Sequence, residues 1–375
     1  MPFRCFLNPR QGPPGIVVLP DGGFRRAKAE ITSWPGYVPT PLRDLPDMAG
    51  LGTVRLKDES LRFGLGSFKA LGGAYAVAGV LKAELARRGI APAATTADLL
   101  ARRYPTTDIT VTCATDGNHG RSVAWGAERF GARCCIFVHE TVSPARVDAI
   151  ARYGAEVRRV PGTYDEAVRA AATAADAQGW FVVSDTSWPG YTEIPRAVMQ
   201  GYRIMADEAL EQWGGAPPTH VFVQGGVGGV AAAVSVHMRA RLDPAPTLVV
   251  VEPDRAACLL ASAEAGQPTA IPGELDTIMA GLACGEPSLL AWQELERAAT
   301  AFVSIEDDAA IDTMRRLASL GIVSGESGAA GLAGLLAAAD HVDVRAALGL
   351  DADCRVLLFS TEGATDPELY EKLVA

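Results

Sequence analysis

The chain has 375 residues, of which 49% are hydrophobic and 21% are charged, and its formal net charge is −10. This length and composition predict a globular protein with two domains. The acidic excess argues against nucleic acid and anionic membranes as the main partners.

Several features bear on where the protein works. No apolar run approaches the roughly 20 residues of a membrane-spanning helix, and the first residues lack the apolar segment of a signal peptide. The seven cysteines include no Cys-x-x-Cys motif, which favours a reducing cytoplasm, and a pairing of Cys258 with Cys284 stays open. The five histidines lack the spacing of metal ligands, so we expect no metal site.

Residues 1 to 50 are rich in proline and glycine and are interpreted as an extended arm. From Thr53 onward, short apolar runs alternate with helical patterns, which predicts an α/β fold with mostly parallel sheets flanked by helices. The expected strands are residues 53–57, 109–113, 133–138, 156–160, 180–183, 219–224, 247–252 and 355–360. The expected helices lie near residues 70–89, 119–130, 144–153, 163–178, 195–213, 229–241, 307–319 and 328–339.

A lysine among glycines follows the first of these strands, in the stretch Gly64-Leu65-Gly66-Ser67-Phe68-Lys69-Ala70-Leu71-Gly72-Gly73. Ser67 is expected to cap a helix that runs from Ala70 to Leu81, which puts Lys69 in its first turn. The positive end of the helix disfavours an ammonium group, and a neutral amine can form a Schiff base with a carbonyl. Taken alone, Lys69 could equally be a solvated lysine.

A second motif opens the helix after the strand at 109–113, and it reads Thr112-Cys113-Ala114-Thr115-Asp116-Gly117-Asn118-His119-Gly120. Ligands bind at such strand ends in α/β sheets. Gly117 and Gly120 let the backbone approach a flat ligand, and Asn118 can donate a hydrogen bond to a phenolate-type oxygen. A tight strand-to-helix turn is the alternative reading.

A third motif, Gln224-Gly225-Gly226-Val227-Gly228-Gly229, also lies between a strand and a helix. Consecutive backbone N–H groups at a helix N-terminus form a phosphate cradle. Dinucleotide binding is a competing interpretation, because Glu252 ends the next strand, and a plain turn is another.

Two further strands end in polar residues. Asp185 follows the strand at 180–183 and offers a carboxylate, although a lone Asp there is more often a cap or turn residue. Ser360 and Thr361 follow the strand at 355–360, where either hydroxyl could contact a ring nitrogen or belong to a turn.

One ligand accounts for these motifs together: an amine for an aldehyde, a donor for an aryl oxygen, a phosphate cradle and a hydroxyl for a pyridine nitrogen describe pyridoxal 5′-phosphate. The order of the motifs resembles the fold type II family of pyridoxal-phosphate enzymes, which includes threonine dehydratase, serine racemase and the tryptophan synthase β chain. Residues 66–73, 115–120, 185–191 and 277–287 resemble the diaminopropionate ammonia-lyase family within it. The resemblance runs from about residue 35 to the C-terminus.

The resemblance implies roles for individual residues. Lys69 would be the Schiff-base lysine, with Asp116 and Asp185 as candidate bases on opposite faces of the substrate. The cofactor contacts would be Phe68, Lys69, Asn118, Gly225, Gly226, Val227, Gly228, Gly229, Glu326 and Ser360 or Thr361. Two departures stand out: Asp116 replaces the small residue of sibling dehydratases, and Val227 stands where related loops often have glycine.

The resemblance also implies two domains and an assembly. Residues 1–90 and 188–375 would form a large cofactor-binding domain, residues 91–187 a small α/β domain, and two chains a homodimer. The implied activity is an α,β-elimination that converts 2,3-diaminopropionate to pyruvate and ammonia. The alternatives are a serine or threonine dehydratase or β-replacement enzyme, a non-catalytic ligand-binding protein, and an NAD-dependent oxidoreductase.

Overall fold

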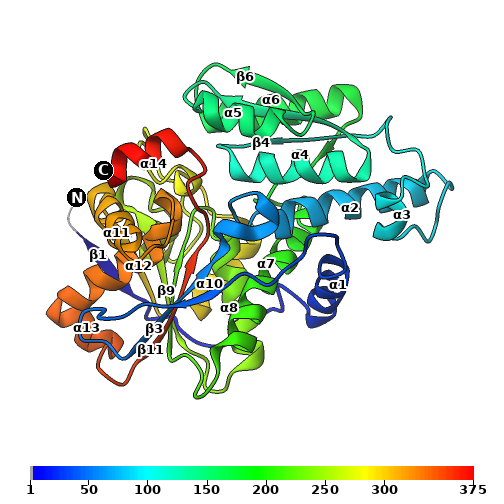
Figure 1. Ribbon diagram of the computed structural model, residues 1–375. Helices are drawn as coiled ribbons and strands as arrows, with labels where there is room; N and C mark the ends of the chain where they lie inside the picture. Colours follow the sequence, from blue (N-terminus) through cyan, green and yellow to red (C-terminus); the bar gives the residue numbers. More distant parts are fainter. Residues whose placement is uncertain (1–2) are drawn as a thin grey trace. The chain divides into compact units, whose positions relative to one another are not determined.

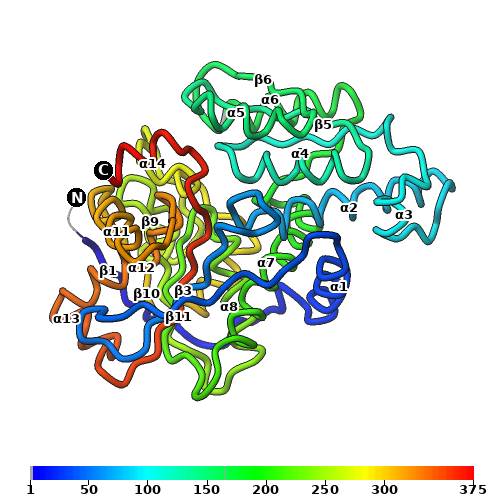
Figure 2. The backbone as a smooth tube through the Cα atoms, in the orientation of Figure 1, coloured from blue at the N-terminus to red at the C-terminus, as the bar shows by residue number. Residues whose placement is uncertain are grey.

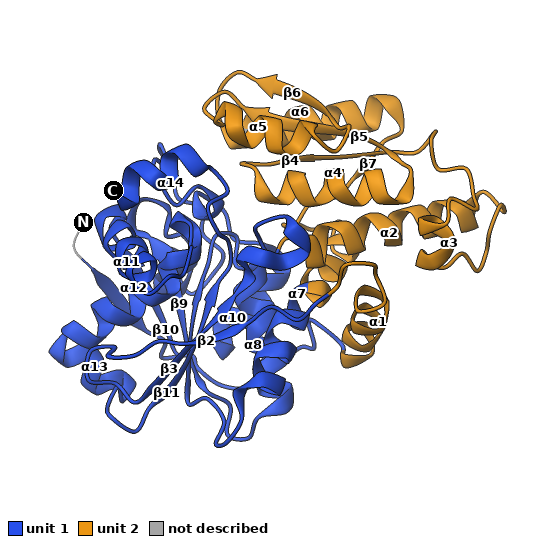
Figure 3. Ribbon diagram, viewed as in Figure 1, with its two compact units in different colours: residues 1–20, 38–68, 202–375 blue, residues 21–37, 69–201 orange. Residues whose placement is uncertain are grey.

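The computed structural model describes residues 3–375, which fold into two compact units (Figure 3). Unit 1 comprises residues 1–20, 38–68 and 202–375, and unit 2 comprises residues 21–37 and 69–201. The backbone trace in Figure 2 lets the reader follow the chain as it passes from one unit to the other after residues 20, 37, 68 and 201.

Unit 1 is built on a sheet that has seven strands within the described residues, in the order β1-β10-β9-β8-β11-β3-β2 (Figure 1). The edge strands β1 and β2 pair antiparallel with their neighbours, and all the other pairs are parallel. The strands are β1 (Arg4–Leu7), β2 (Leu42–Asp44), β3 (Thr53–Asp58), β8 (His220–Gln224), β9 (Thr247–Pro253), β10 (Ala301–Ile305) and β11 (Arg355–Ser360).

Helices cover both faces of this sheet, with α11 and α12 on one side and α8 and α10 on the other in Figure 1. The helices of unit 1 are η1 (Glu59–Gly64), α8 (Gly229–Arg241), η2 (Asp254–Ala256), α9 (Cys258–Ala265), η3 (Ala280–Leu282), α10 (Leu289–Ala298), α11 (Asp307–Ser319), α12 (Glu326–Asp340), α13 (Val342–Leu348) and α14 (Pro367–Val374). Helix α12 approaches the strands closely through glycine, because a Cβ on Gly331 would lie 3.2 Å from the carbonyl oxygen of Phe222. The core of unit 1 is therefore formed where α12 packs on the central strands.

Unit 2 is built on a parallel sheet in the order β6-β5-β4-β7, with four strands in the described part of the chain. Its strands are β4 (Thr110–Ala114), β5 (Arg133–His139), β6 (Glu156–Val160) and β7 (Phe181–Val182). Its helices are α1 (Asp21–Ile31), α2 (Ala70–Arg87), α3 (Thr96–Leu100), α4 (Asn118–Phe130), α5 (Pro144–Ala151) and α6 (Tyr164–Gln178), while α7 (Glu193–Trp213) contains the division between the units. The predicted α/β class with mostly parallel sheets is thus confirmed.

The prediction of an extended arm over residues 1 to 50 is wrong. This region contains β1, α1 and β2, and α1 buries Phe24, Ala27 and Ile31 along one stripe. The spacing of these three side chains is that of an amphipathic helix, but Gly22 and Gly23 at its start suggested a loop. The sequence analysis also missed β10, α3, α9, α10, α13 and α14.

The compact units differ from the predicted domain boundaries at residues 90 and 188, because residues 21–37, 69–90 and 188–201 belong to unit 2. The physical reason at 69–90 is the packing of α2 against α4. A Cβ on Gly126 of α4 would lie 2.8 Å from the Cα of Ala74 in α2, so the two backbones are nearly in contact. Helix α2 therefore belongs to the core of unit 2.

This contact predicts that Gly126→Ala destabilises the protein. The added methyl group has no room, and overpacking of this kind typically costs about 1–3 kcal/mol. Gly79→Ala is the matched control, because a Cβ on this exposed glycine of α2 meets no atom within 4 Å. The control should be neutral or stabilising by up to about 1 kcal/mol. Thermal and urea unfolding of both variants measure the difference, and equal stabilities would contradict the packing argument.

Candidate active site

Four buried charges order the chain just before Lys69. Arg62 pairs with Glu59 at 2.8 Å and with Glu208 at 2.7 Å, and Lys57 pairs with Glu208 at 2.7 Å. All four side chains are at most 3% exposed, and their formal charges cancel. Burial lowers the pKa of Lys57, although Glu208 and Glu59 oppose this effect. The cluster fixes η1, which connects β3 to the lysine segment.

The residues directly before Lys69 are tied to the end of β11. The N–H of Phe68 donates to the carbonyl oxygen of Thr361 at 3.1 Å, and Ser67 pairs with Glu362 in an isolated antiparallel bridge. The backbone of Ser67 is thus engaged in pairing, and the N-cap position predicted for Ser67 is occupied by Lys69. Helix α2 begins at Ala70 with Lys69 as its N-cap residue, one position before the predicted first turn.

Lys69 forms an ion pair with Asp185, whose Oδ2 accepts a hydrogen bond from Nζ at 2.5 Å. Both side chains are largely buried, with exposures of 19% and 14%. Burial alone would raise the pKa of Asp185, but the charges of His119 and Lys69 and the hydrogen bond from Lys69 hold it well below its usual range.

His119, the second residue of α4, joins this pair. Its Nε2 lies 2.7 Å from the carbonyl oxygen of Val183, which requires a proton on Nε2, and its Nδ1 lies 3.7 Å from Asp185 Oδ2. Burial lowers the pKa of His119, although the charge of Asp185 opposes this shift. Nδ1 is buried and has no hydrogen-bond partner among the described residues. From the sequence alone, no role was predicted for His119.

Asp116 has a different partner. Its Oδ1 lies 2.7 Å from His139 Nε2, and the Nδ1 of the same ring lies 2.9 Å from the hydroxyl of Thr141. Asp116 follows β4, and Asp185 follows β7, which pairs with β4 in parallel. The structure therefore brings the two predicted carboxylates to the same edge of the sheet of unit 2.

The start of α4 is shaped by Thr115. Its Oγ1 accepts hydrogen bonds from the N–H groups of Gly117 and Gly120, both at 3.0 Å. Gly117 has a φ of +149°, a conformation that only glycine adopts readily. Asn118 follows as the first residue of α4, where its Oδ1 accepts from Arg121 at 2.7 Å. The predicted role of Asn118 would use the N–H donors of the same amide group.

The glycine motif forms the turn from β8 into α8. The N–H groups of Gly226, Val227, Gly228 and Gly229 have no hydrogen-bond acceptor within the described part of the chain. A Cβ on Gly226 would lie 3.1 Å from Cys284 Sγ, so the loop is packed on that side. Consecutive donors at a helix N-terminus fit an anionic group such as a phosphate. Val227 leaves this donor set intact.

Glu252 decides against the dinucleotide interpretation of this motif. It is fully buried at the end of β9, and its two carboxylate oxygens accept from the N–H groups of Leu259 and Leu260, both at 2.7 Å. An acidic residue that recognises a ribose must face the ligand. Glu252 instead holds the first turn of α9.

The side chain of Gln224 contacts the end of β11. Gln224 Nε2 donates to the carbonyl oxygen of Phe359 at 3.0 Å and to Thr361 Oγ1 at 2.7 Å. Ser360 is fully buried and donates to Ser324 Oγ at 2.8 Å. Glu326, 2% exposed, is the first residue of α12. Sequence reasoning treated Gln224 as part of a glycine motif and missed that its side chain holds Thr361, one of the two predicted hydroxyl residues.

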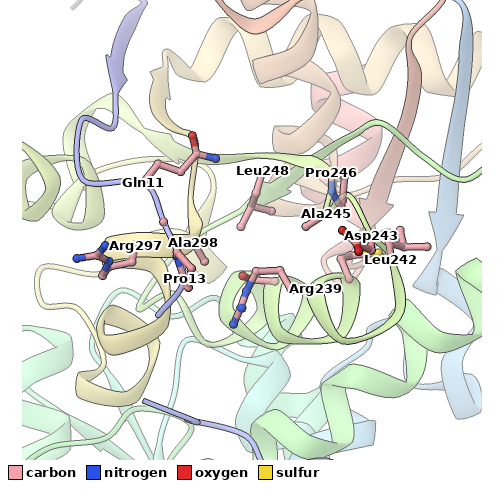
Figure 4. A pocket seen from close by; sticks show the side chains of 13 residues that line it. Gln11, Pro13, Arg239, Leu242, Asp243, Ala245, Pro246, Leu248, Arg297 and Ala298 are labelled. Carbon is pink, nitrogen blue, oxygen red and sulfur yellow. The ribbon is translucent and has the colours of Figure 1, made fainter. Parts of the chain in front are cut away.

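A separate cavity of about 610 Å³ opens in unit 1 near the C-terminal ends of α8 and α10 (Figure 4). Gln11, Arg239, Asp243 and Arg297 line it, and none of the predicted site residues does.

Three findings concern membranes, metals and thiols. Over residues 3–375, no helix is long and apolar enough to cross a membrane, and no group of three or more potential ligands gathers as a metal site would require. All seven cysteines are free thiols, so Cys258 and Cys284 are not paired in this structure.

Comparisons with known proteins identify the family of the chain. The family of pyridoxal-phosphate dependent enzymes matches residues 33–350. The chain is 43% identical over 358 residues to diaminopropionate ammonia-lyase of Escherichia coli (strain K12), which covers 90% of this chain and 88% of that protein. A crystal structure of holo diaminopropionate ammonia-lyase from Escherichia coli has a TM-score of 0.91 and 38% identity and covers 99% of this chain and 96% of that one. The Escherichia coli enzyme in complex with D-serine also has a TM-score of 0.91, with 37% identity and the same coverage.

Glu252 predicts a pH dependence of stability. Burial raises its pKa to about 8, although the two backbone donors oppose the shift. An unfolded glutamate has a pKa of about 4.3. Between these values the folded chain retains a proton that the unfolded chain has released, so the free energy of unfolding should fall as the pH rises.

Glu252→Gln cannot titrate and should remove this component, which amounts to at most about 1.4 kcal/mol per pH unit. Urea unfolding across the window from about pH 5 to about pH 8 measures it. Glu264→Gln, at a partly exposed position of α9, is the control and should keep the wild-type slope. Parallel curves for wild type and Glu252→Gln would contradict the assignment.

Proposed function

The chain belongs to the family of pyridoxal-phosphate dependent enzymes, and on that premise we propose that it catalyses the α,β-elimination of 2,3-diaminopropionate to pyruvate and ammonia. One observation carries the proposal: Lys69 is bound to the carboxylate of Asp185 at 2.5 Å, at the sheet edge that also carries the second carboxylate, Asp116. The high identity to enzymes that are named for this reaction supports it.

The residues of the chain fit the cofactor. We propose that Lys69 Nζ binds the aldehyde, that the N–H groups of Gly226 to Gly229 hold the phosphate, and that Asn118 donates to the ring oxygen. Gly225 would contribute to the loop through its backbone, because its N–H already donates to the carbonyl oxygen of Val251 at 2.8 Å. Thr361 suits the ring nitrogen better than Ser360, because Ser360 already donates to Ser324, whereas Thr361 Oγ1 accepts from Gln224 and keeps its own proton to donate. Phe68 and Glu326 are proposed to contact the cofactor as well.

When bound, pyridoxal phosphate withdraws electrons from the α-carbon of an amino acid and so makes its hydrogen acidic. The chain supplies the base that takes this proton. Asp185 Oδ2 is held ionised beside Lys69, and Asp116 keeps its second oxygen, Oδ2, outside the contact with His139. A carboxylate near the substrate also attracts the second ammonium group that distinguishes diaminopropionate from serine and threonine. An acid must then protonate the departing β-amino group.

We further propose a homodimer in a reducing cytoplasm. Seven free thiols support the compartment. Exposed apolar side chains of unit 1, among them Val17, Val38 and Leu61, support burial against a second chain. A serine or threonine dehydratase, or a β-replacement enzyme on a related amino acid, is the second candidate function, because the same lysine and phosphate loop would serve it.

Keto-acid release tests the function. Purified protein is incubated with D- and L-diaminopropionate, D- and L-serine and L-threonine, and we expect the fastest release of pyruvate from diaminopropionate. Lys69→Ala should lose this activity together with the covalent labelling of the protein by pyridoxal phosphate and borohydride. Faster turnover of serine or threonine than of either diaminopropionate isomer would favour the second candidate.

The two carboxylates should divide the two enantiomers, because each isomer presents its α-hydrogen to the opposite face. We expect Asp185→Asn to slow the L-isomer and Asp116→Asn to slow the D-isomer, each by about 10²–10⁴ in kcat. If the aspartates merely bind the ammonium group, each variant should slow both isomers and mainly raise KM. Steady-state kinetics at matched cofactor content separates these outcomes.

A further inference from the structure

Asp116 is the end of a chain of three polar side chains. His139 Nε2 lies 2.7 Å from Asp116 Oδ1, and His139 Nδ1 lies 2.9 Å from Thr141 Oγ1. The side chains of Asp116 and His139 are 19% and 17% exposed, whereas Thr141 is exposed. No element of the proposed reaction uses His139 or Thr141.

The register of two parallel strands creates this contact. Ala114 of β4 pairs with Phe137 of β5, and the N–H of Thr115 donates to the carbonyl oxygen of Phe137 at 3.0 Å. His139 is the last residue of β5, and Asp116 lies two residues beyond the end of β4, in the turn into α4. The register of the two strands therefore places the start of this turn beside His139.

Hydrogen bonds from Arg159 also restrain the segment that carries His139 and Thr141. Arg159 of β6 donates through Nη1 to the carbonyl oxygens of Glu140 at 2.6 Å and Val142 at 2.8 Å. These bonds restrain the turn after β5. The backbone that carries the imidazole of His139 is therefore fixed in position.

The partners determine which ring nitrogen carries the proton. An ionised carboxylate has no hydrogen to donate, so Nε2 must donate to Asp116. The hydroxyl of Thr141 can then donate to an unprotonated Nδ1. This arrangement places the Nε2 proton on Oδ1 of Asp116, and it leaves Oδ2 outside the contact with His139.

We propose, on the basis of the proposed function, that His139 is a positioning residue for Asp116 and that Thr141 fixes its tautomer. His139 orients the carboxylate so that Oδ2 can reach the α-hydrogen, and it thereby supports the enantiomer whose turnover needs Asp116. Asp185 is oriented separately by Lys69 and His119. Each face of the substrate therefore has its own carboxylate, and the two carboxylates are oriented by different residues.

The test compares variants on both isomers of diaminopropionate. His139→Leu should affect the same isomer as Asp116→Asn. We expect kcat for that isomer to fall about tenfold to hundredfold, since misplacing a catalytic group by about 1 Å can cost this much. The other isomer, KM and cofactor content should change little. His139→Gln retains an N–H donor and should restore most of the rate, and Thr141→Val should have a smaller effect in the same direction.

Controls separate the inference from the proposed function. His341→Leu, a histidine substitution in unit 1, should leave both isomers unaffected. Adding His139→Leu to Asp116→Asn should cost nothing further, because both act through one group. Equal losses for both isomers, or no loss, would overturn the role of His139, whereas a wild-type protein inactive on both isomers would overturn the function itself.

A second readout does not involve turnover. In cofactor-free protein with ¹⁵N-labelled histidine, the His139 signals should be those of a ring protonated at Nε2, assigned by their loss in His139→Gln. Asp116→Leu should remove this preference while the signals of the other histidines remain. A neutral His139 protonated at Nδ1 in the wild type would contradict the proposal.

Discussion

A buried cluster of four charges determines the path of the chain into Lys69. Lys57, Glu59, Arg62 and Glu208 lie within 2.8 Å of their partners and are almost fully enclosed. Taking such groups out of water is costly, and a cluster of this kind is stable only when every member is paired. Removing one member would leave an uncompensated buried charge, typically at a cost of about 3–5 kcal/mol. The cluster consequently favours a single conformation of η1.

That conformation contains local strain. Phe63, within η1, has a φ of +52°, which a residue with a large side chain seldom adopts. The charges on one side of this residue and the pairing of Ser67 with Glu362 on the other fix both ends of the turn. The position of the lysine backbone is therefore set by buried polar contacts before any cofactor binds.

Sequence reasoning found what depends on local patterns. The apolar runs of β8, β9 and β11 identified buried parallel strands, and the glycines after β8 identified a loop with N–H donors to spare. Sequence reasoning failed where contacts between residues far apart in the sequence determine the structure. Ser67 has the chemistry of a helix cap, but its backbone pairs with a residue almost 300 positions away. From its position in the sequence, Glu252 could have contacted a ribose. In the structure, both of its carboxylate oxygens accept hydrogen bonds from N–H groups of α9.

The same distinction explains the site. Asp116 and Asp185 could be selected from their motifs because each follows a strand, but their partners could not, since these follow from strand order and register. The order β5-β4-β7 places His139, Asp116 and Asp185 at successive strand ends of one sheet. A register in which Ala114 did not pair with Phe137 would separate Asp116 from His139. A fold of this class is compatible with many reactions, so the chemistry depends on which carboxylate the sheet places beside a lysine and which beside a histidine.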